Sequence, residues 1–207
     1  MTYTLLVMAK SPRPGMVKTR LTPPLSAEQA AAVAEASLVD TLQAVLAARA
    51  DRRVLSLAGP AGPWLPDGID VVGQVEGGLD VRLGAALSQV QGPVLLIGMD
   101  TPQVDAPLLD DSRRTLLTAG VDAVLGAAAD GGFWALGLRV PDPSLVLGVP
   151  MSVPHTGREQ RDRLFGARLR VRDLPVLRDV DTPADAAAVA ALVPGSRFAR
   201  TWLTSRS

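Results

Sequence analysis

The chain of 207 residues contains no cysteine and a single histidine, His155. Without cysteine, the protein has no disulfide, no thiolate nucleophile and no Cys-ligated zinc or iron–sulfur site. A single histidine leaves too few ligands for a multi-histidine metal site and makes a Ser-His-Asp triad hard to assemble. If the protein is an enzyme, carboxylates and cations therefore have to carry the chemistry.

The sequence also lacks a net charge, because 21 Lys and Arg residues balance 21 Asp and Glu residues. A balanced chain has no overall field that would hold a nucleic acid or a membrane surface, so neither is expected as a partner. The apolar segment at residues 3–9 is far too short to span a bilayer and follows no cationic flank. We therefore expect a cytoplasmic protein without a membrane span.

Short apolar runs alternate with helical patterns along the chain. The runs predict strands at residues 3–9, 54–58, 69–72, 93–99, 121–128, 133–140 and 168–174. Helices are predicted at residues 26–50, 79–90, 106–119, 158–166 and 183–192. This alternation is typical of a mostly parallel α/β sheet covered by helices on both faces. We expect one domain, residues 1–195, and a tail, residues 196–207, without a predicted element.

The loop after the first predicted strand is rich in cations, and open parallel sheets bind ligands at the carboxyl ends of their strands. Its four cations, which include both lysines of the sequence, are Lys10, Arg13, Lys18 and Arg20. Prolines and Gly15 give the loop a fixed shape, and a compact ammonium suits contacts with phosphate oxygens. The loop is a candidate phosphate cradle, although a solvated surface loop has the same composition.

Aspartates stand at two later positions of the same kind. Asp100 ends an apolar strand, where it can bind a hard divalent cation or cap the turn. Asp179 and Asp181 precede the helix that Pro183 opens, and their i, i+2 spacing directs both side chains the same way in an extended segment. The alternative is helix capping by Asp181 or Thr182. Capping and metal binding do not exclude each other.

A glycine pair separates the fifth and sixth apolar runs, in the segment Asp130-Gly131-Gly132-Phe133. The segment is too short for a parallel crossover, which predicts an antiparallel pair in the second half of the chain. Paired glycines allow positive φ and a close approach to a ligand. A plain tight turn is the alternative.

Taken together, these segments resemble the GT-A-like nucleotide-diphospho-sugar transferase superfamily, and specifically a small bacterial glycosyltransferase-like group related to 2-phospho-L-lactate guanylyltransferase. The matching segments are Ala9 to Pro12, Lys18 to Leu21, Gly98 to Pro102, Asp130 to Phe133 and Asp179 to Asp185. They follow one another through nearly the whole chain. The resemblance implies a single open, mostly parallel twisted sheet covered by helices.

The resemblance also implies roles for individual residues. The first loop would bind nucleotide phosphates through Ala9, Lys10, Arg13, Gly15, Lys18, Thr19 and Arg20. Asp100 and Asp181 would hold Mg²⁺ or Mn²⁺, and Lys18 and Asp100 would be the catalytic residues. The acceptor side would be lined by Asp130, Gly131, Gly132 and Phe133.

The implied reaction is Mg²⁺-dependent nucleotidyl transfer from an NTP to a small phosphorylated acceptor, with release of pyrophosphate. Such chemistry needs positioning and charge neutralisation rather than a protein nucleophile. Two alternatives are glycosyl transfer from an NDP-sugar and nucleotide binding without catalysis. No second aspartate beside Asp100 makes the D-x-D of many glycosyltransferases, which favours nucleotidyl transfer.

Overall fold

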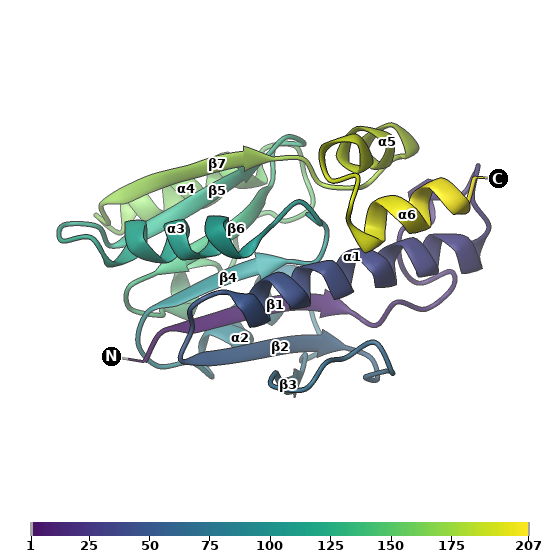
Figure 1. The fold of residues 1–207 in the computed structure, drawn as a ribbon. Coiled ribbons are helices and arrows are strands. Elements are labelled where there is room, and N and C mark those ends of the chain that lie inside the picture. The colour runs from purple at the N-terminus through teal and green to yellow at the C-terminus, as the bar shows by residue number, and fades with distance from the viewer. Residues whose placement is uncertain (1, 207) are drawn as a thin grey trace.

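A sheet of seven strands in the order β3-β2-β1-β4-β6-β5-β7 organises the computed structural model, which describes residues 2–206 (Figure 1). The strands are β1 Thr4–Lys10, β2 Arg52–Ala58, β3 Asp70–Gly73, β4 Val94–Gly98, β5 Ala123–Ala128, β6 Phe133–Leu138 and β7 Val171–Leu177. Only β6 runs antiparallel to its neighbours, β4 and β5. The expected mostly parallel sheet with an antiparallel insertion is confirmed.

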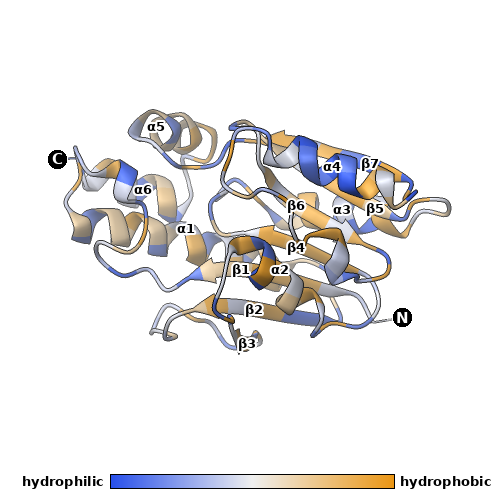
Figure 2. Cartoon of the chain, turned by 180° about the vertical axis from the view of Figure 1, so that it is seen from behind, coloured by the Kyte–Doolittle hydropathy of each residue, from blue (hydrophilic) through white to orange (hydrophobic). Residues whose placement is uncertain are grey.

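Helices cover both faces of this sheet. They are α1 Ala27–Ala47, α2 Leu79–Leu87, α3 Ala106–Leu117, α4 Thr156–Gly166, α5 Pro183–Leu192 and α6 Arg197–Thr204, with short 3₁₀ helices η1 Thr19–Leu21 and η2 Pro143–Leu145. Helices α1 and α3 lie on one face, and α2 and α4 on the other (Figures 1 and 2).

Successive side chains along β1 point to opposite faces of the sheet, and both faces are buried under helices. Leu5 and Val7 lie in the core cluster that includes Leu38 of α1. Leu6, between them, lies in the cluster of the other face with Leu87 of α2. A strand with helices on both sides reads as a continuous apolar run, which is why the sequence predicted β1 so closely.

Strand β7 runs from 171 to 177, three residues later than the predicted span of 168–174. Arg168 has a φ of 60° just after α4, so the chain leaves the helix in a left-handed conformation before it can extend. Pro175 did not end the strand, because β7 is the last strand in the sheet order and an edge strand tolerates a residue without an N–H.

Residues 196–207, expected as a tail without a predicted element, contain α6. Ser196 caps this helix by accepting a hydrogen bond from Ala199 N at 2.9 Å. Phe198 and Trp202, one helical turn apart, are 0% and 1% exposed. They pack in a third hydrophobic cluster between α1, α5 and α6. The two buried aromatic residues therefore hold α6 against α1 and α5.

Helix α1 is long and apolar enough, by length and composition alone, to cross a membrane. However, 61% of the apolar window is buried inside the structure, where α1 contacts α3 and α6. A core helix passes the same test, so residues 2–206 contain no clear membrane span.

Candidate functional site

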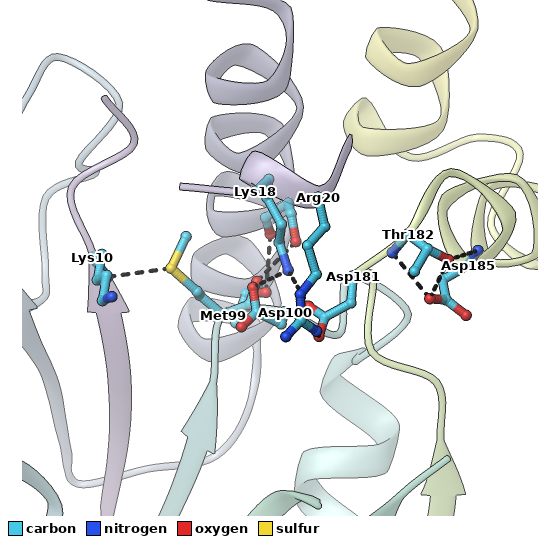
Figure 3. A network of polar contacts seen from close by, with 10 residues as sticks. Lys10, Lys18, Arg20, Met99, Asp100, Asp181, Thr182 and Asp185 are labelled. Atoms are coloured by element: carbon cyan, nitrogen blue, oxygen red, sulfur yellow. Dashed lines mark hydrogen bonds and ion pairs between the residues drawn. The ribbon is translucent and has the colours of Figure 1, made fainter. Parts of the chain in front are cut away.

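Three segments that are far apart in the sequence meet at the carboxyl ends of the parallel strands. Nζ of Lys18, from the loop after β1, lies 2.5 Å from Oδ1 of Asp100, which follows β4. The same Nζ lies 3.3 Å from Oδ1 of Asp181, between β7 and α5. Figure 3 shows the ammonium between the two aspartates, with Arg20 alongside. The Lys18 side chain is 7% exposed, against 45% for Asp100 and 36% for Asp181.

Backbone and side-chain hydrogen bonds tie the two aspartate segments together. Val180 N donates to the carbonyl oxygen of Asp100 at 2.9 Å. Nε2 of Gln103 donates to the carbonyl oxygen of Arg178 at 2.7 Å. These bonds fix the segment after β4 against the segment after β7. The two carboxylates therefore meet Lys18 in a braced arrangement rather than on free loops.

The backbone of Lys18 adopts a left-handed conformation, with φ 48° and ψ 36°, immediately before η1. This conformation costs a non-glycine residue of the order of 1 kcal/mol and is concentrated at functional sites. Leu21, at the end of η1, is fully buried in the third hydrophobic cluster. The short helix is thus anchored on one side while Lys18 is directed at the aspartates on the other.

The capping alternative for the late segment is decided by Thr182. Its side chain accepts a hydrogen bond from Asp185 N at 3.2 Å, and Oδ2 of Asp185 accepts one from Thr182 N at 3.0 Å. This capping box begins α5. Asp181 is therefore not the cap, and its carboxylate accepts from Lys18 and, at 3.4 Å, from Arg20.

The pKa values of two groups at this edge are raised: that of Lys18 by neighbouring charges, and that of Asp179 mainly by burial. Burial lowers the pKa of Lys18, but the charges of Asp100 and Asp181 outweigh it, so the pKa is raised and the ammonium stays protonated. Burial raises the pKa of Asp179 to about 7, and the charges of Asp130 and Asp100 add to the effect. Ionising Asp179 therefore costs more than ionising an ordinary aspartate.

Asp179 was not among the predicted metal ligands. Its i, i+2 spacing from Asp181 predicted that the two side chains point the same way, but only Asp181 was expected to bind the ion. The charges of Asp130, Asp100 and Asp181 all act on Asp179. This edge therefore gathers more negative charge than the two predicted metal ligands alone would bring.

The four predicted cations divide into two pairs. Lys18 and Arg20 approach the aspartates, although the Arg20 side chain is 76% exposed. Lys10 and Arg13 are exposed, and among residues 2–206 neither forms an ion pair. The backbone N of Lys10 donates to Sδ of Met99 at 3.2 Å, which links the ends of β1 and β4 without using the ammonium.

The structure places the other predicted residues of the first loop in β1, in a turn and in η1, away from the contacts that Lys18 makes. Ala9 is buried at the end of β1, and its carbonyl oxygen accepts from Nε2 of Gln74 at 3.0 Å. Gly15 lies in an exposed turn with φ 74°. Thr19 is exposed as the first residue of η1. Their contacts with a nucleotide remain predictions.

The glycine pair after β5 is explained largely by packing. Gly131 has a φ of 91°, and a Cβ there would lie 1.9 Å from the carbonyl oxygen of Pro154. Gly157 N, at the start of α4, donates to the carbonyl oxygen of Gly131 at 2.8 Å. Asp130 accepts from Gly132 N at 2.8 Å. The tight-turn interpretation accounts for these glycines, and the acceptor role of Asp130 to Phe133 stays a prediction.

The donor chemistry fits a hard divalent cation shared with a substrate. Within residues 2–206, no group of three or more His, Cys, Asp or Glu side chains is arranged to hold a metal. Asp100 and Asp181 nevertheless place two carboxylates around one cationic atom. Mg²⁺ is commonly bound by one or two carboxylates together with substrate phosphates. These residues therefore suit an ion that a phosphate helps to bind, rather than a cage made only of protein ligands.

A protein family described as "Uncharacterized protein conserved in bacteria (DUF2064)" matches residues 30–153. The chain belongs to this family. The matched range contains Asp100 and the Asp130 loop, whereas Lys18 and Asp181 lie on either side of it. No match is found among the curated proteins.

Solved structures extend the likeness beyond the range of the DUF2064 match. A protein of Desulfovibrio desulfuricans G20, provisionally named a nucleotide-diphospho-sugar transferase, is 26% identical with a TM-score of 0.85, over 98% of this chain and 94% of that one. Rv0371c of Mycobacterium tuberculosis H37Rv is 26% identical with a TM-score of 0.57, over 91% and 97%. Glucosyl-3-phosphoglycerate synthase of Mycobacterium tuberculosis is 14% identical with a TM-score of 0.59, over 96% and 80%, and shows the fold alone.

These neighbours confirm the GT-A-like superfamily and the expected fold for this DUF2064 member. The Desulfovibrio protein also supports the general class of nucleotide-dependent transferase. The substrates of those proteins do not transfer with the fold, because one fold hosts many functions. The reaction has to be argued from the side chains at the sheet edge.

Proposed function

We propose that this DUF2064 member is a Mg²⁺-dependent nucleotidyltransferase, which joins an NTP to a small phosphorylated acceptor and releases pyrophosphate. The observation that carries the proposal is the convergence of Lys18, Asp100 and Asp181, with Nζ–O distances of 2.5 and 3.3 Å. A buried cation beside two carboxylates can serve both partners of a metal–phosphate complex. The ammonium offers positive charge to phosphate oxygens, and the carboxylates offer ligands to the ion.

The charge of the first loop matches a triphosphate better than a diphosphate. Lys18 and Arg20 would contact the β and γ oxygens, while Lys10 and Arg13, which are exposed, would attract and then clamp the phosphates. An ammonium is a compact point charge, whereas a guanidinium is a planar fork. The loop thus combines both ways of binding phosphate oxygens.

Asp100 and Asp181 would hold the divalent ion, with Asp100 as the principal ligand. When bound, such an ion neutralises charge on the phosphates during transfer. By the family resemblance, Asp130 to Phe133 would line the acceptor side, and the charge of Asp130 acts on Asp179 at the same edge. Rv0371c, one of the structural neighbours, has been crystallised as a complex with manganese. Mn²⁺ is therefore a suitable probe ion for this chain.

Glycosyl transfer from an NDP-sugar is the second candidate. It is favoured by the provisional name of the Desulfovibrio protein and by the complex of glucosyl-3-phosphoglycerate synthase with Mn²⁺ and UDP. Here the same ion site would bind the departing diphosphate. The absence of a D-x-D at Asp100 and the four cations of the first loop favour nucleotidyl transfer.

A donor panel tests the two reactions against each other. The protein is incubated with Mg²⁺ or Mn²⁺, a set of small phosphorylated acceptors, and either the four common NTPs or a set of NDP-sugars. We expect pyrophosphate from one or more NTPs, and its loss when EDTA removes the ion. Free NDP from an NDP-sugar, without pyrophosphate from any NTP, would establish glycosyl transfer instead.

A third outcome of the panel is thermal stabilisation by nucleotide, as expected from ligand linkage, without product from any donor. That result would assign the chain to nucleotide binding without catalysis. A cytoplasmic location, expected from the sequence, stays a prediction alongside this proposal.

A further inference from the structure

The cation that lies between the two proposed metal ligands belongs to the protein itself. Nζ of Lys18 is within 3.3 Å of both Asp100 and Asp181. Its side chain is 7% exposed, so solvent screens its interaction with the carboxylates only weakly. The space between the carboxylates is thus filled by a group with the same sign of charge as a metal ion.

We propose that the Lys18 ammonium substitutes for the divalent ion in the ligand-free protein and moves to the phosphates when nucleotide and metal bind. The proposal rests on the proposed function, because it assigns the phosphates and the ion to this edge. It makes Lys18 an exchangeable counter-ion as well as a phosphate contact. Metal binding and nucleotide binding then depend on each other.

Charge balance gives the reason for the exchange. Asp100 and Asp181 together carry two negative charges; Lys18 is the buried cation between them, and the exposed Arg20 lies 3.4 Å from Asp181. A divalent ion that arrives alone meets repulsion from the ammonium at close range, where Coulomb energies are large. Phosphate oxygens offer the ammonium another partner and free both carboxylates. By linkage, a nucleotide that helps the metal to bind is helped equally by the metal.

The structure also allows the movement. The backbone next to Lys18 is held by Leu21, which is fully buried in the third hydrophobic cluster. The lysine stem has four flexible carbons, so the ammonium can swing without moving that anchor. Arg20, 76% exposed and 3.4 Å from Asp181, can remain on that carboxylate. The exchange therefore requires a change of side-chain conformation and no rearrangement of the fold.

The sequence makes the exchange directly observable, because the chain contains only two lysines, Lys10 and Lys18. In protein with ¹⁵N-labelled lysine, NMR of the ammonium groups gives at most two signals, and the exposed Lys10 serves as an internal reference. We expect Mg²⁺ together with inorganic tripolyphosphate to shift the Lys18 signal. Mg²⁺ alone should need a concentration at least about tenfold higher for the same shift.

Metal affinity without nucleotide provides the second test. Mn²⁺ binding is measured by electron paramagnetic resonance for the wild type, Lys18→Met and Arg52→Met. Arg52 is the matched control, because it is an arginine 3.1 Å from an aspartate, Asp70, at the opposite edge of the sheet. We expect Lys18→Met to bind Mn²⁺ at least about tenfold more tightly than the wild type. Arg52→Met should match the wild type.

The outcomes separate this inference from the proposed function. If Lys18→Met binds Mn²⁺ with equal or weaker affinity, or the Lys18 signal does not respond to Mg²⁺ with tripolyphosphate, the exchange is wrong, even where pyrophosphate is produced. If nucleotide-dependent Mn²⁺ binding and pyrophosphate release are both missing from the wild type, the proposed function fails as well. Lys18→Gln replaces Lys18→Met if the latter does not fold, and the NMR test needs no variant.

Discussion

At the edge of the sheet where the parallel strands begin, Asp122 and Asp51 each accept hydrogen bonds from a residue of their own. Asp122, before β5, accepts hydrogen bonds from the backbone N, Nε and Nη2 of Arg170 at 2.7 to 2.9 Å. Asp51 accepts from Tyr3 N at 2.7 Å. At the edge where the strands end, Asp100 and Asp181 share the buried ammonium of Lys18, Asp181 also faces the exposed Arg20, and Asp179 lies under the influence of the charges of Asp130 and Asp100. The two edges differ in charge balance, not in residue type.

The pKa shifts of Asp122 and Asp179 show how this difference affects the stability of the fold. Hydrogen bonds from Arg170 hold the pKa of Asp122 far below its usual range, so its ionisation favours the folded state. Burial and neighbouring aspartates raise the pKa of Asp179 to about 7, so its ionisation opposes folding. The first edge is built to hold the strands together. The second keeps an excess of negative charge that a bound cation would relieve, which is typical of functional sites.

The largest expected effect is on the rate of the proposed reaction, when a carboxylate is removed from the edge where the strands end. Asp100→Asn keeps the size of the side chain but removes the charge proposed to bind the divalent ion. We expect the rate of pyrophosphate release to fall at least about a hundredfold, the range seen when one preorganised electrostatic contact is lost. Initial rates at saturating Mg²⁺ measure this.

Asp122→Asn is the matched control for Asp100→Asn, since it makes the same change at the other edge of the sheet. Its rate at neutral pH should equal that of the wild type. Equal rate losses in the two variants would show that the contrast between the edges has no functional meaning, and a fully active Asp100→Asn would remove Asp100 from the mechanism.

A second prediction concerns the third hydrophobic cluster, which packs against the segments that carry Lys18 and Asp181. Trp202 of α6 is 1% exposed, and its cluster includes Leu21 and Val180, which belong to the segments that carry Lys18 and Asp181. Trp202→Ala should lower the free energy of unfolding by about 3–5 kcal/mol, a large part of the 5–15 kcal/mol typical of a domain. Urea denaturation measures the loss.

The same variant should also weaken Mn²⁺ binding in the presence of nucleotide while the protein is still folded. Leu164→Ala is the control, because Leu164 is fully buried in the cluster of the α2 and α4 face, which contains no residue of the loops that carry Lys18, Asp100 and Asp181. It should lose stability and keep its affinity for Mn²⁺. If both variants lose affinity in proportion to their stability, α6 has no particular role in positioning Lys18 and Asp181.

The sequence predicted most of the fold because central strands such as β1 and β4 are buried on both faces and helices such as α1, α3 and α5 have clear N-caps. Helix α5 spans Pro183–Leu192 as expected, since Pro183 and the Thr182 cap mark its beginning. Helix α6 was missed because only eight residues form it, and its aromatic pair becomes meaningful only once α1 and α5 lie beside it. Tertiary packing, rather than local propensity, makes that helix.

For the candidate site, residue types were easier to predict than partners. Asp100 and Asp181 were expected to act together, and the structure brings both to Lys18. No sequence pattern revealed that the ammonium would lie between them, because that contact depends on the left-handed backbone at Lys18. The buried state of Asp179 was equally hidden, since burial depends on segments far apart in the chain.

The smallest expected effect tests the edge where the strands begin. Because the pKa of Asp122 is depressed in the folded state, its contribution to stability is fully present above the ordinary aspartate pKa of about 4. It is lost as the pH falls through the lower folded value. Asp122→Asn should therefore be less stable than the wild type at pH 7, and the difference should shrink below about pH 4. Urea unfolding of both proteins between pH 2.5 and pH 7 measures it, and a difference that stays constant or grows in acid would mean that the hydrogen bonds from Arg170 do not favour the ionised carboxylate.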